Sequence, residues 1–195
     1  MDTRAAILQH AETLIRTRGY AAFSFADLAG HAGIRKASVH HHFATKEDLV
    51  AVLLSEYLER FVAALEGVRQ SETAAPARLR VYARFFLDGF EKGMLPLCGA
   101  LSAERAALPA AMQPRINGFF QLHLDWLHRL IEDGMADGSL RPGLNVRATA
   151  LLLLSTLEGG SFVGWALTDI TTVLAAFDAA LDTIVPATIT KGDGV

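Results

Sequence analysis

The N-terminal segment of the chain carries apolar residues in the spacing of an α-helix. They recur with a period of about 3.6 residues and so form one stripe: Ile7, Leu8, Ala11, Leu14 and Ile15. Gly19 follows, and glycine often ends a helix because it adopts a left-handed backbone conformation without strain. The pattern therefore predicts a first helix that ends at Gly19.

Two capping boxes mark further helix starts. In such a box a side-chain oxygen accepts a hydrogen bond from the backbone N–H three residues later, and an acidic side chain there returns the bond. Ser24 and Asp27 form the first box, which predicts a short helix through about His31. Thr45 and Asp48 form the second, which predicts the start of a long helix.

A tight turn and a third short helix lie between these two starts. Gly33 stands at the centre of the turn, and the helix is predicted from about Arg35 to Phe43. Two short helices joined by a three-residue turn with a central glycine are typical of a helix-turn-helix. The second helix would expose a polar side, with Val39 and Phe43 facing back into the domain.

Pro and Gly residues divide the rest of the chain into further helical segments. The apolar spacing predicts helices over about 77–92, up to about 107, and over 114–137, 146–167 and 171–184. Few β-branched residues stand beside many Ala and Leu residues, which favours helices over strands. We therefore expect an all-α fold, with a three-helix N-terminal domain over residues 1–48 and a larger helical domain over 49–195.

Composition narrows the class of protein. Hydrophobic residues make up 51% and charged residues 20%, which supplies a core and is atypical of a disordered tail. No apolar run reaches the roughly 20 residues needed to cross a bilayer, and the N-terminus lacks the apolar core of a signal peptide. Cys98 is the sole cysteine, so an intrachain disulfide is excluded. We expect a cytoplasmic protein with no membrane partner.

Net charge alone does not indicate a partner that is a nucleic acid. The chain carries a net charge of −3, and residues 1–49 hold six basic and five acidic residues. The position of the polar residues is more informative, because the second helix of the motif would present Arg35, Lys36, Ser38, His40 and His41. Lys46 begins the next helix, where an ammonium group and free backbone N–H groups could both meet a phosphate.

Residues 3–53 closely resemble the tetracycline-repressor (TetR) family of transcriptional regulators. Many residues at fixed spacings carry the resemblance: Gly19-Tyr20, Ser24, Asp27-Leu28-Ala29, Ala32-Gly33-Ile34, Lys36-Ala37-Ser38-Val39, His42-Phe43 and Lys46-Glu47-Asp48-Leu49. The remaining residues resemble the family only in their plan of helices. The resemblance implies a DNA-binding domain followed by a domain for ligand binding and dimerisation.

The family pattern also implies roles for individual residues. Ser24 would cap the first helix of the motif and touch a phosphate, while Ala37 would let the backbone approach DNA. His40 departs from the Tyr that the family most often has there, although imidazole can still donate to a phosphate. The candidate DNA contacts are Ser24, Arg35, Lys36, Ala37, Ser38, His40, His41 and Lys46.

Aromatic residues in the C-terminal part of the chain either fill the core or line a pocket for an effector. The residues that we expect to line a pocket are Phe86, Phe90, His123, Trp126 and Trp165. Such a lining favours a small, largely apolar or aromatic effector. The alternative is that these side chains serve packing alone.

Cys98 lies in a stretch similar to a TetR branch in which cysteines sense oxidants or electrophiles. In that branch a further cysteine often stands two positions earlier, where this chain has Pro96. A lone cysteine among Leu, Gly and Ala is otherwise an inert buried thiol. Redox or electrophile sensing through Cys98 is the alternative to an apolar effector.

Three glycines interrupt the strongly helical segment 146–167. Gly159, Gly160 and Gly164 each cost about 0.5–1 kcal/mol relative to Ala, so close helix approach should offset them. Together with the neighbouring apolar runs they predict a homodimer through the last two helices, as a four-helix interface. The alternative is tight packing inside one subunit.

Catalytic and metal chemistry find no support in the sequence. We find no nucleophile with a base and no acid pair at matched spacing, so we predict that the protein is not an enzyme. His40, His41 and His42 are consecutive and point about 100° apart on a helix, so they cannot share one metal ion. We expect no cofactor.

The function predicted is that of a dimeric DNA-binding transcriptional regulator. It would bind a palindromic operator in double-stranded DNA as a repressor and leave it when a small effector binds. A ligand-binding or sensing protein that keeps the fold without binding DNA is the alternative.

Overall fold

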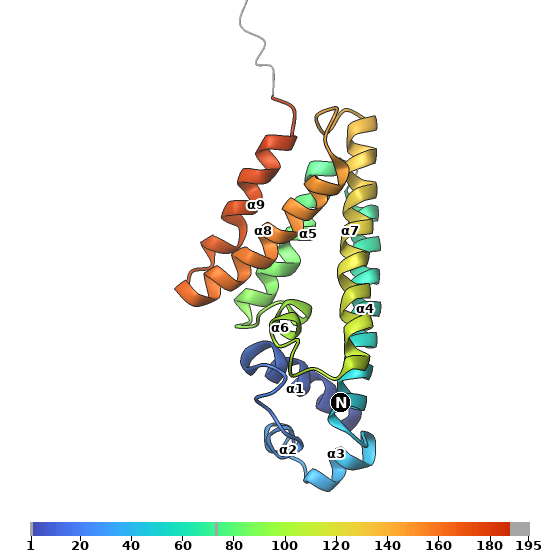
Figure 1. Ribbon diagram of the computed structural model, residues 1–195, viewed down its shortest axis with the longest axis vertical. Helices are drawn as coiled ribbons and strands as arrows, with labels where there is room; N and C mark the ends of the chain where they lie inside the picture. Colours follow the sequence, from blue (N-terminus) through green and yellow to red (C-terminus); the bar gives the residue numbers. More distant parts are fainter. Residues whose placement is uncertain (1, 73, 188–195) are drawn as a thin grey trace, which may run out of the picture.

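The computed structural model describes residues 2–72 and 74–187, and all regular elements in these ranges are helices. Three short or medium helices lie at one end of the molecule: α1 (Thr3–Arg18), α2 (Phe25–Ala32) and α3 (Lys36–His42). The long helix α4 (Lys46–Ser71) runs from that end along the length of the molecule (Figure 1). The fold is therefore all-α with an N-terminal helix-turn-helix, as predicted.

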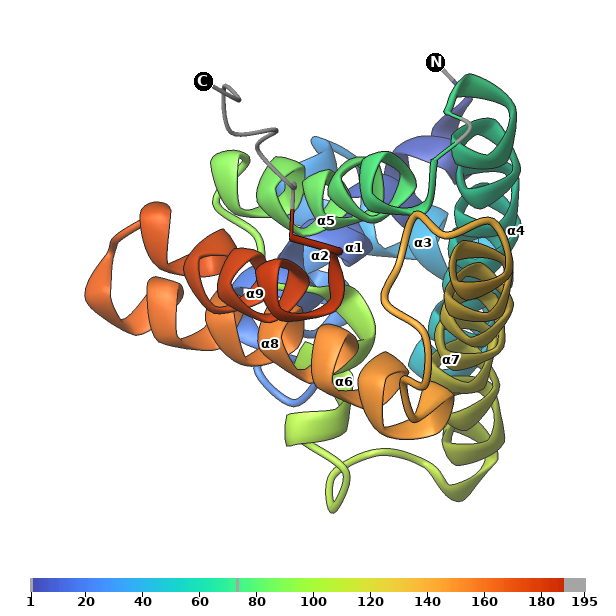
Figure 2. The ribbon, with the colours of Figure 1, turned by 90° about the horizontal axis from the view of Figure 1, so that it is seen from above.

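The remaining helices form the larger part of the molecule. They are α5 (Ala75–Glu91), α6 (Leu97–Ala103), the 3₁₀ helix η1 (Ala110–Met112), α7 (Gln113–Ala136), α8 (Val146–Leu167) and α9 (Thr171–Ile184). α7 lies beside α4, while α8 runs from α7 toward the outside with α9 packed along it (Figure 2). The short helix α6 lies between this part and α1 (Figure 1).

Most predicted helix bounds agree with the structure, and α8 and α9 have the predicted bounds. The helix predicted to run to about residue 107 ends earlier, at Ala103. Glu104 follows it, and its carboxylate accepts hydrogen bonds from the distant backbone N–H groups of Tyr20 and Ala21. This long-range contact and the turns after Ala103 were not visible in the local pattern.

Two groups of buried side chains make up the core. The first joins α1, α2 and α3 to the start of α4 and continues through Leu97, Cys98 and Leu101 of α6. The second lies among α5, α7, α8 and α9, with Phe177 and Tyr82 fully buried in it. Burial of such side chains supplies most of the stabilisation of packed helices. The first core extends from α1 to α6. The three N-terminal helices therefore pack directly against the larger helical part of the molecule.

Two of the three glycines in α8 allow close packing within the chain. A Cβ on Gly160 would lie 2.6 Å from the carbonyl oxygen of Val173, and one on Gly164 would lie 2.8 Å from that of Asp169. The prediction that these glycines face a second subunit is therefore wrong for Gly160 and Gly164, which face the start of α9. Gly159 is exposed and has open space around it.

α8 also corrects the expectation about membrane spans. Among the described residues it is the one helix long and apolar enough to cross a bilayer by length and composition. The inner side of α8 packs against α5, α7 and α9. A helix in the core of a globular domain can have the same length and hydropathy as a membrane span, so these two properties alone are weak evidence for a span. The sequence search missed it because Glu158 interrupts the apolar run.

Candidate nucleic-acid interface and effector cavity

The helix-turn-helix consists of α2, the turn at Gly33 and α3. Asp27 Oδ2 accepts a hydrogen bond from the Ser24 N–H at 2.7 Å, and Ser24 Oγ accepts one from the Asp27 N–H at 3.3 Å. These bonds form the predicted capping box. The Ser24 hydroxyl also donates to Asp27 Oδ2 at 2.6 Å, and this bond together with the one from the Ser24 N–H holds the pKa of Asp27 below its ordinary value. Gly33 has a φ of 66°, in the left-handed region that favours glycine. The turn thus sets α3 at an angle to α2.

The outer face of α3 gathers most of the candidate DNA contacts. Val39 is fully buried and anchors the helix, which leaves its other side open to solvent. Within residues 2–72 and 74–187, the side chains of Arg35 and Lys36 form no hydrogen bond or ion pair. The residues of this face are Arg35, Lys36, Ala37, His40 and His41, which are exposed, and Ser38, which is half-buried. Two unpaired cations on an exposed helix suit contact with phosphates.

His40 also contributes to packing. Its ring lies edge-on to that of Phe25, with 4.9 Å between the centroids. Phe25 belongs to α2 and is buried, whereas His40 is exposed. His40 therefore packs α3 against α2 and still presents an imidazole edge to the outside.

The Lys46 side chain points into the domain. Its ammonium group donates to the carbonyl oxygens of Tyr20 and of Phe23, the latter at 2.5 Å, and lies 4.0 Å from the centre of the Phe23 ring. Burial lowers the pKa of Lys46 from its ordinary value. The interpretation of this ammonium group as free for a phosphate is therefore corrected. The backbone N–H groups at the start of α4 are the candidates for contact with a phosphate that remain there.

A narrow cavity that opens to solvent lies among α4, α5, α6, α7 and α8. Aromatic rings supply much of its wall, and the polar groups in it are few. The lining residues are Arg16, Tyr57, Phe61, Phe85, Phe86, Pro96, Leu97, Phe119, His123 and Glu158. A concave, mainly apolar site with a few polar groups is typical of a binding site for a small molecule.

His123 is a buried polar group of this cavity. Its Nδ1 lies 2.6 Å from the hydroxyl oxygen of Tyr82, and its ring stacks on Phe61 with 4.2 Å between the centroids. Burial lowers the pKa of His123 to about 3, so its ring is neutral. Its Nε2 is buried, and the part of the chain that the structure describes offers it no hydrogen-bond partner.

Glu158 is the second buried polar group, and the sequence search missed it as a site residue. Its Oε2 is buried and has no hydrogen-bond partner among the described residues. Burial raises the pKa of Glu158 to about 7. The sequence does mark Glu158 as unusual, because it is the only charged residue between positions 148 and 167.

Two sets of contacts join α1 and the α1–α2 turn to the segment around α6; we call them the latch. In the first, Arg16 Nε donates to the carbonyl oxygen of Leu95 at 2.6 Å, and the Leu95 N–H donates to that of Arg16 at 3.2 Å. In the second, the Glu104 carboxylate accepts from the Tyr20 N–H at 2.8 Å and the Ala21 N–H at 2.7 Å. The latch residues are thus Arg16, Leu95, Glu104, Tyr20 and Ala21.

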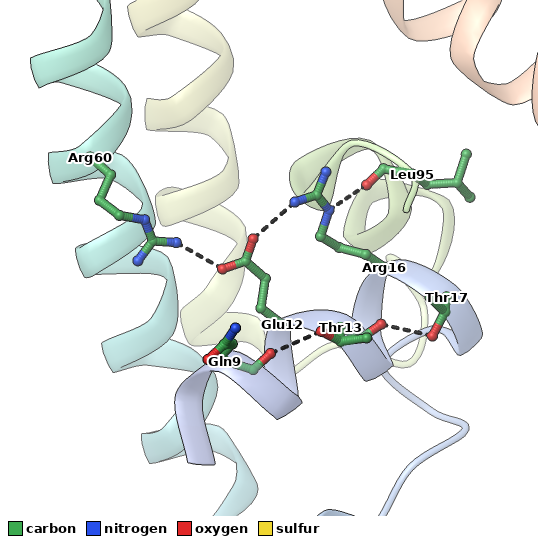
Figure 3. Close-up of polar contacts among 7 residues, drawn as sticks. All are labelled: Gln9, Glu12, Thr13, Arg16, Thr17, Arg60 and Leu95. Atoms are coloured by element: carbon green, nitrogen blue, oxygen red, sulfur yellow. Dashed lines mark hydrogen bonds and ion pairs between the residues drawn. The ribbon is translucent and has the colours of Figure 1, made fainter. Parts of the chain in front are cut away.

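Further bonds orient the Arg16 guanidinium (Figure 3). Its Nη1 donates to Glu12 Oε1 at 2.9 Å, and Arg60 Nη2 of α4 donates to Glu12 Oε2 at 2.8 Å. Arg16 therefore connects α1 to the α5–α6 segment directly and to α4 through Glu12. Arg16 belongs to α1, the helix that precedes the helix-turn-helix, and its side chain also lines the cavity. One side chain therefore takes part in both the latch and the cavity wall.

Comparisons with known proteins agree with this arrangement. Residues 7–53 match the family model described as bacterial regulatory proteins, tetR family. A solved structure from Agrobacterium tumefaciens, described as a transcriptional regulator of the TetR family, superposes with a TM-score of 0.90. It is 31% identical in sequence, and the alignment covers 94% of this chain and 98% of that one. This chain belongs to the TetR family.

Curated relatives of the chain are described as transcriptional regulators as well. HTH-type transcriptional regulator CymR of Pseudomonas putida is 28% identical over 140 residues, which cover 70% of this chain and 69% of the relative. HTH-type transcriptional repressor KstR2 of Mycobacterium tuberculosis is 29% identical over 147 residues, 73% of this chain and 72% of the relative. The protein is thus a DNA-binding transcriptional regulator and not an enzyme.

The cavity of this TetR-family protein contains two of the five residues predicted to line a pocket, Phe86 and His123. Phe90 and Trp165 instead pack edge to face, with 6.4 Å between centroids, and are absent from its wall. Trp126 stacks on Tyr82, with 5.1 Å between the centroids, and lines an outer groove between α4, α5 and α7. Those three predictions are not supported as cavity contacts, because helix periodicity finds an inward face without locating the cavity along it.

Cys98 is buried in α6, with 1% of its surface exposed. Burial strongly raises the pKa of its thiol, and the nearby Glu158 carboxyl raises it further. A thiol reacts with oxidants and electrophiles chiefly as the thiolate. Its surroundings therefore favour the inert thiol over the redox alternative.

Proposed function

We propose that the protein is a dimeric repressor that leaves a palindromic operator when a small, largely apolar effector enters the cavity. The observation that carries the proposal is that the cavity and the latch share Arg16 and adjoin the same segment, Leu95–Leu97. An effector that moves this segment would move α1 with it. Coupling between two sites requires such an element that both sites bias.

In this proposal residues 1–48 bind DNA and residues 49–195 bind the effector and form the dimer. The outer face of α3 would enter the major groove, with Arg35, Lys36, Ala37, Ser38, His40 and His41 toward the DNA. Ser24 and the backbone N–H groups at Lys46 would meet phosphates. The protein would act in the cytoplasm, where its operator lies.

The dimer would form through α8 and α9. Leu151, Leu152, Val163 and Leu167 on α8 are between 47% and 65% exposed, and Gly159 lies between them on the helix. The only charged residue from 148 to 167 is Glu158, which faces inward. An exposed helix face that is apolar and carries no charge favours contact with a second subunit.

Fluorescence anisotropy against the DNA just upstream of the protein's own gene tests the proposal. We expect specific binding that weakens with salt, because phosphate contacts release counterions. Lys36→Ala should weaken binding and reduce the salt dependence, whereas Lys92→Ala, an exposed lysine outside the motif, should change neither. Lack of specific binding to this DNA and to a random-sequence pool would contradict the proposal.

A further inference from the structure

Glu158 lacks the partner that a buried carboxylate normally has. A carboxylate moved out of water is costly unless hydrogen bonds or an opposite charge offset the loss of hydration. Oε2 of Glu158 has neither within residues 2–72 and 74–187. A group that destabilises the empty protein in this way is a candidate for contact with a ligand.

The packing around Glu158 keeps space for it. A Cβ built on Gly99 of α6 would collide with Oε2 of Glu158, so a side chain at Gly99 would displace the carboxylate. The same carboxylate lines the cavity. Gly99 thus holds α6 close to α8 while leaving the Glu158 carboxylate in place.

The cations and titratable groups near the cavity do not neutralise Glu158. Arg16 is engaged with Glu12 and with the Leu95 carbonyl oxygen. His123 is neutral, because burial lowers its pKa. Above about pH 7 the Glu158 carboxylate therefore offers the cavity a negative group whose Oε2 has no partner among the described residues.

The rest of the wall suits a positive charge on an apolar body. The rings of Tyr57, Phe61, Phe85, Phe86 and Phe119 line the cavity with Glu158. Aromatic faces carry negative electrostatic potential and attract cations. They also provide apolar surface for the body of the ligand.

We propose that the cavity takes a small organic cation, an amine with an aromatic or aliphatic body, whose ammonium group pairs with the Glu158 carboxylate. His123 Nε2 is a second buried polar atom without a partner in the described structure, and it offers the ligand one neutral hydrogen bond. A neutral alcohol would satisfy a lone pair of Glu158 but leave its charge unpaired, and a carboxylate ligand would be repelled. The inference rests on the proposed function, since it names the chemical class of the effector.

Three probes that share one ring test it: benzylamine, benzyl alcohol and benzoate, titrated calorimetrically into the full chain. We expect benzylamine to bind most tightly and benzoate most weakly. Glu158→Gln should weaken benzylamine binding about tenfold or more, because a charge-assisted hydrogen bond becomes a neutral one. Glu66→Gln removes the same charge from an exposed residue outside the cavity and should leave the order and the affinities unchanged.

Equal or tighter binding of benzyl alcohol or benzoate to the unmodified protein would overturn the inference, and so would binding of none of the three. Retention of tight benzylamine binding in a folded Glu158→Gln variant would overturn it too. If that variant fails to fold by circular dichroism, the ranking of the probes on the unmodified protein decides.

Operator binding measured without any probe separates this inference from the proposed function. Benzylamine that binds at Glu158 without releasing the operator would support the cation site and contradict its role as the effector site. Intact operator binding without any probe binding would overturn the cation site alone.

Discussion

Arg16 and Leu95 are hydrogen-bonded to each other in both directions. The guanidinium Nε of Arg16 donates to the Leu95 carbonyl oxygen at 2.6 Å, and the Leu95 N–H donates to the Arg16 carbonyl oxygen at 3.2 Å. Seventy-nine positions separate the two residues in the chain. The C-terminal turn of α1 therefore moves with the segment that precedes α6 and borders the cavity.

Glu104→Ala removes the second half of the latch. We expect the free energy of unfolding to fall by about 1–2 kcal/mol, because two hydrogen bonds to a carboxylate are replaced by bonds to water. We also expect an effector to release the operator less completely, since α6 and the α1–α2 turn are less firmly joined. Denaturant unfolding and operator anisotropy with and without effector measure the two effects. Glu59→Ala is the control, because Glu59 is an exposed acidic residue of α4 outside the latch. If Glu59→Ala reduced operator release by the effector as much as Glu104→Ala does, the role of the latch would be contradicted.

Lys46→Met should act on stability rather than on phosphate binding. The ammonium group is held by the carbonyl oxygens of Tyr20 and Phe23, so its loss leaves both acceptors without their donor. We expect a loss of about 1–3 kcal/mol in the free energy of unfolding. The salt dependence of operator binding should stay as in the unmodified protein. A salt dependence reduced as much as in Lys36→Ala would show instead that the ammonium group reaches a phosphate.

Glu158→Gln should make the empty protein more stable at high pH. Burial raises the pKa of Glu158 from 4.5 to about 7, so the folded state holds a proton that the unfolded state releases. The stabilisation from that proton is fully present below about pH 4.5 and is lost as the pH rises through about 7. Gln resembles the protonated carboxyl group at every pH. The variant should therefore match the unmodified protein near pH 4.5 and exceed it by up to about 3 kcal/mol at pH 8.

The other groups around Glu158 do not obscure this measurement. Burial raises the pKa values of Tyr57, Tyr82 and Cys98, which keeps these groups neutral up to pH 8. The titration of His123 occurs in both proteins and cancels in the difference. Denaturant unfolding of the two proteins at pH 5 and pH 8 measures the effect. A difference in stability that does not change between these values would contradict the raised pKa.

Val163→Asp should dissociate the proposed dimer. Val163 is 50% exposed on the outer face of α8, so the change removes little packing within the subunit. In a two-fold interface the substitution occurs once in each subunit, so two unpaired carboxylates would be buried. Sedimentation should show monomers, and operator affinity should fall steeply because two half-sites are no longer bound together. Val62→Asp on α4 is 46% exposed and should leave the dimer intact. A Val163→Asp protein that stays dimeric would place the interface elsewhere.

Local pattern was enough to predict the helices and the DNA-binding motif. Apolar spacing and the capping boxes at Ser24 and Thr45 depend on residues within one or two turns of each other. The start of α3 after Gly33 follows from the same short-range rules. Such features are set by the sequence because the atoms that satisfy each other are near neighbours in the chain.

Tertiary contacts decided the rest. Lys46, Glu104 and Arg16 find their partners 26, 84 and 79 positions away, and no local pattern indicates those distances. Gly160 and Gly164 could serve either a neighbouring helix or a second subunit, and the approach of α9 settled which. Glu158 could be seen as an unusual charge in an apolar segment. Its role depends on the unpaired carboxylate facing a cavity, and five other helices have to pack before that cavity exists.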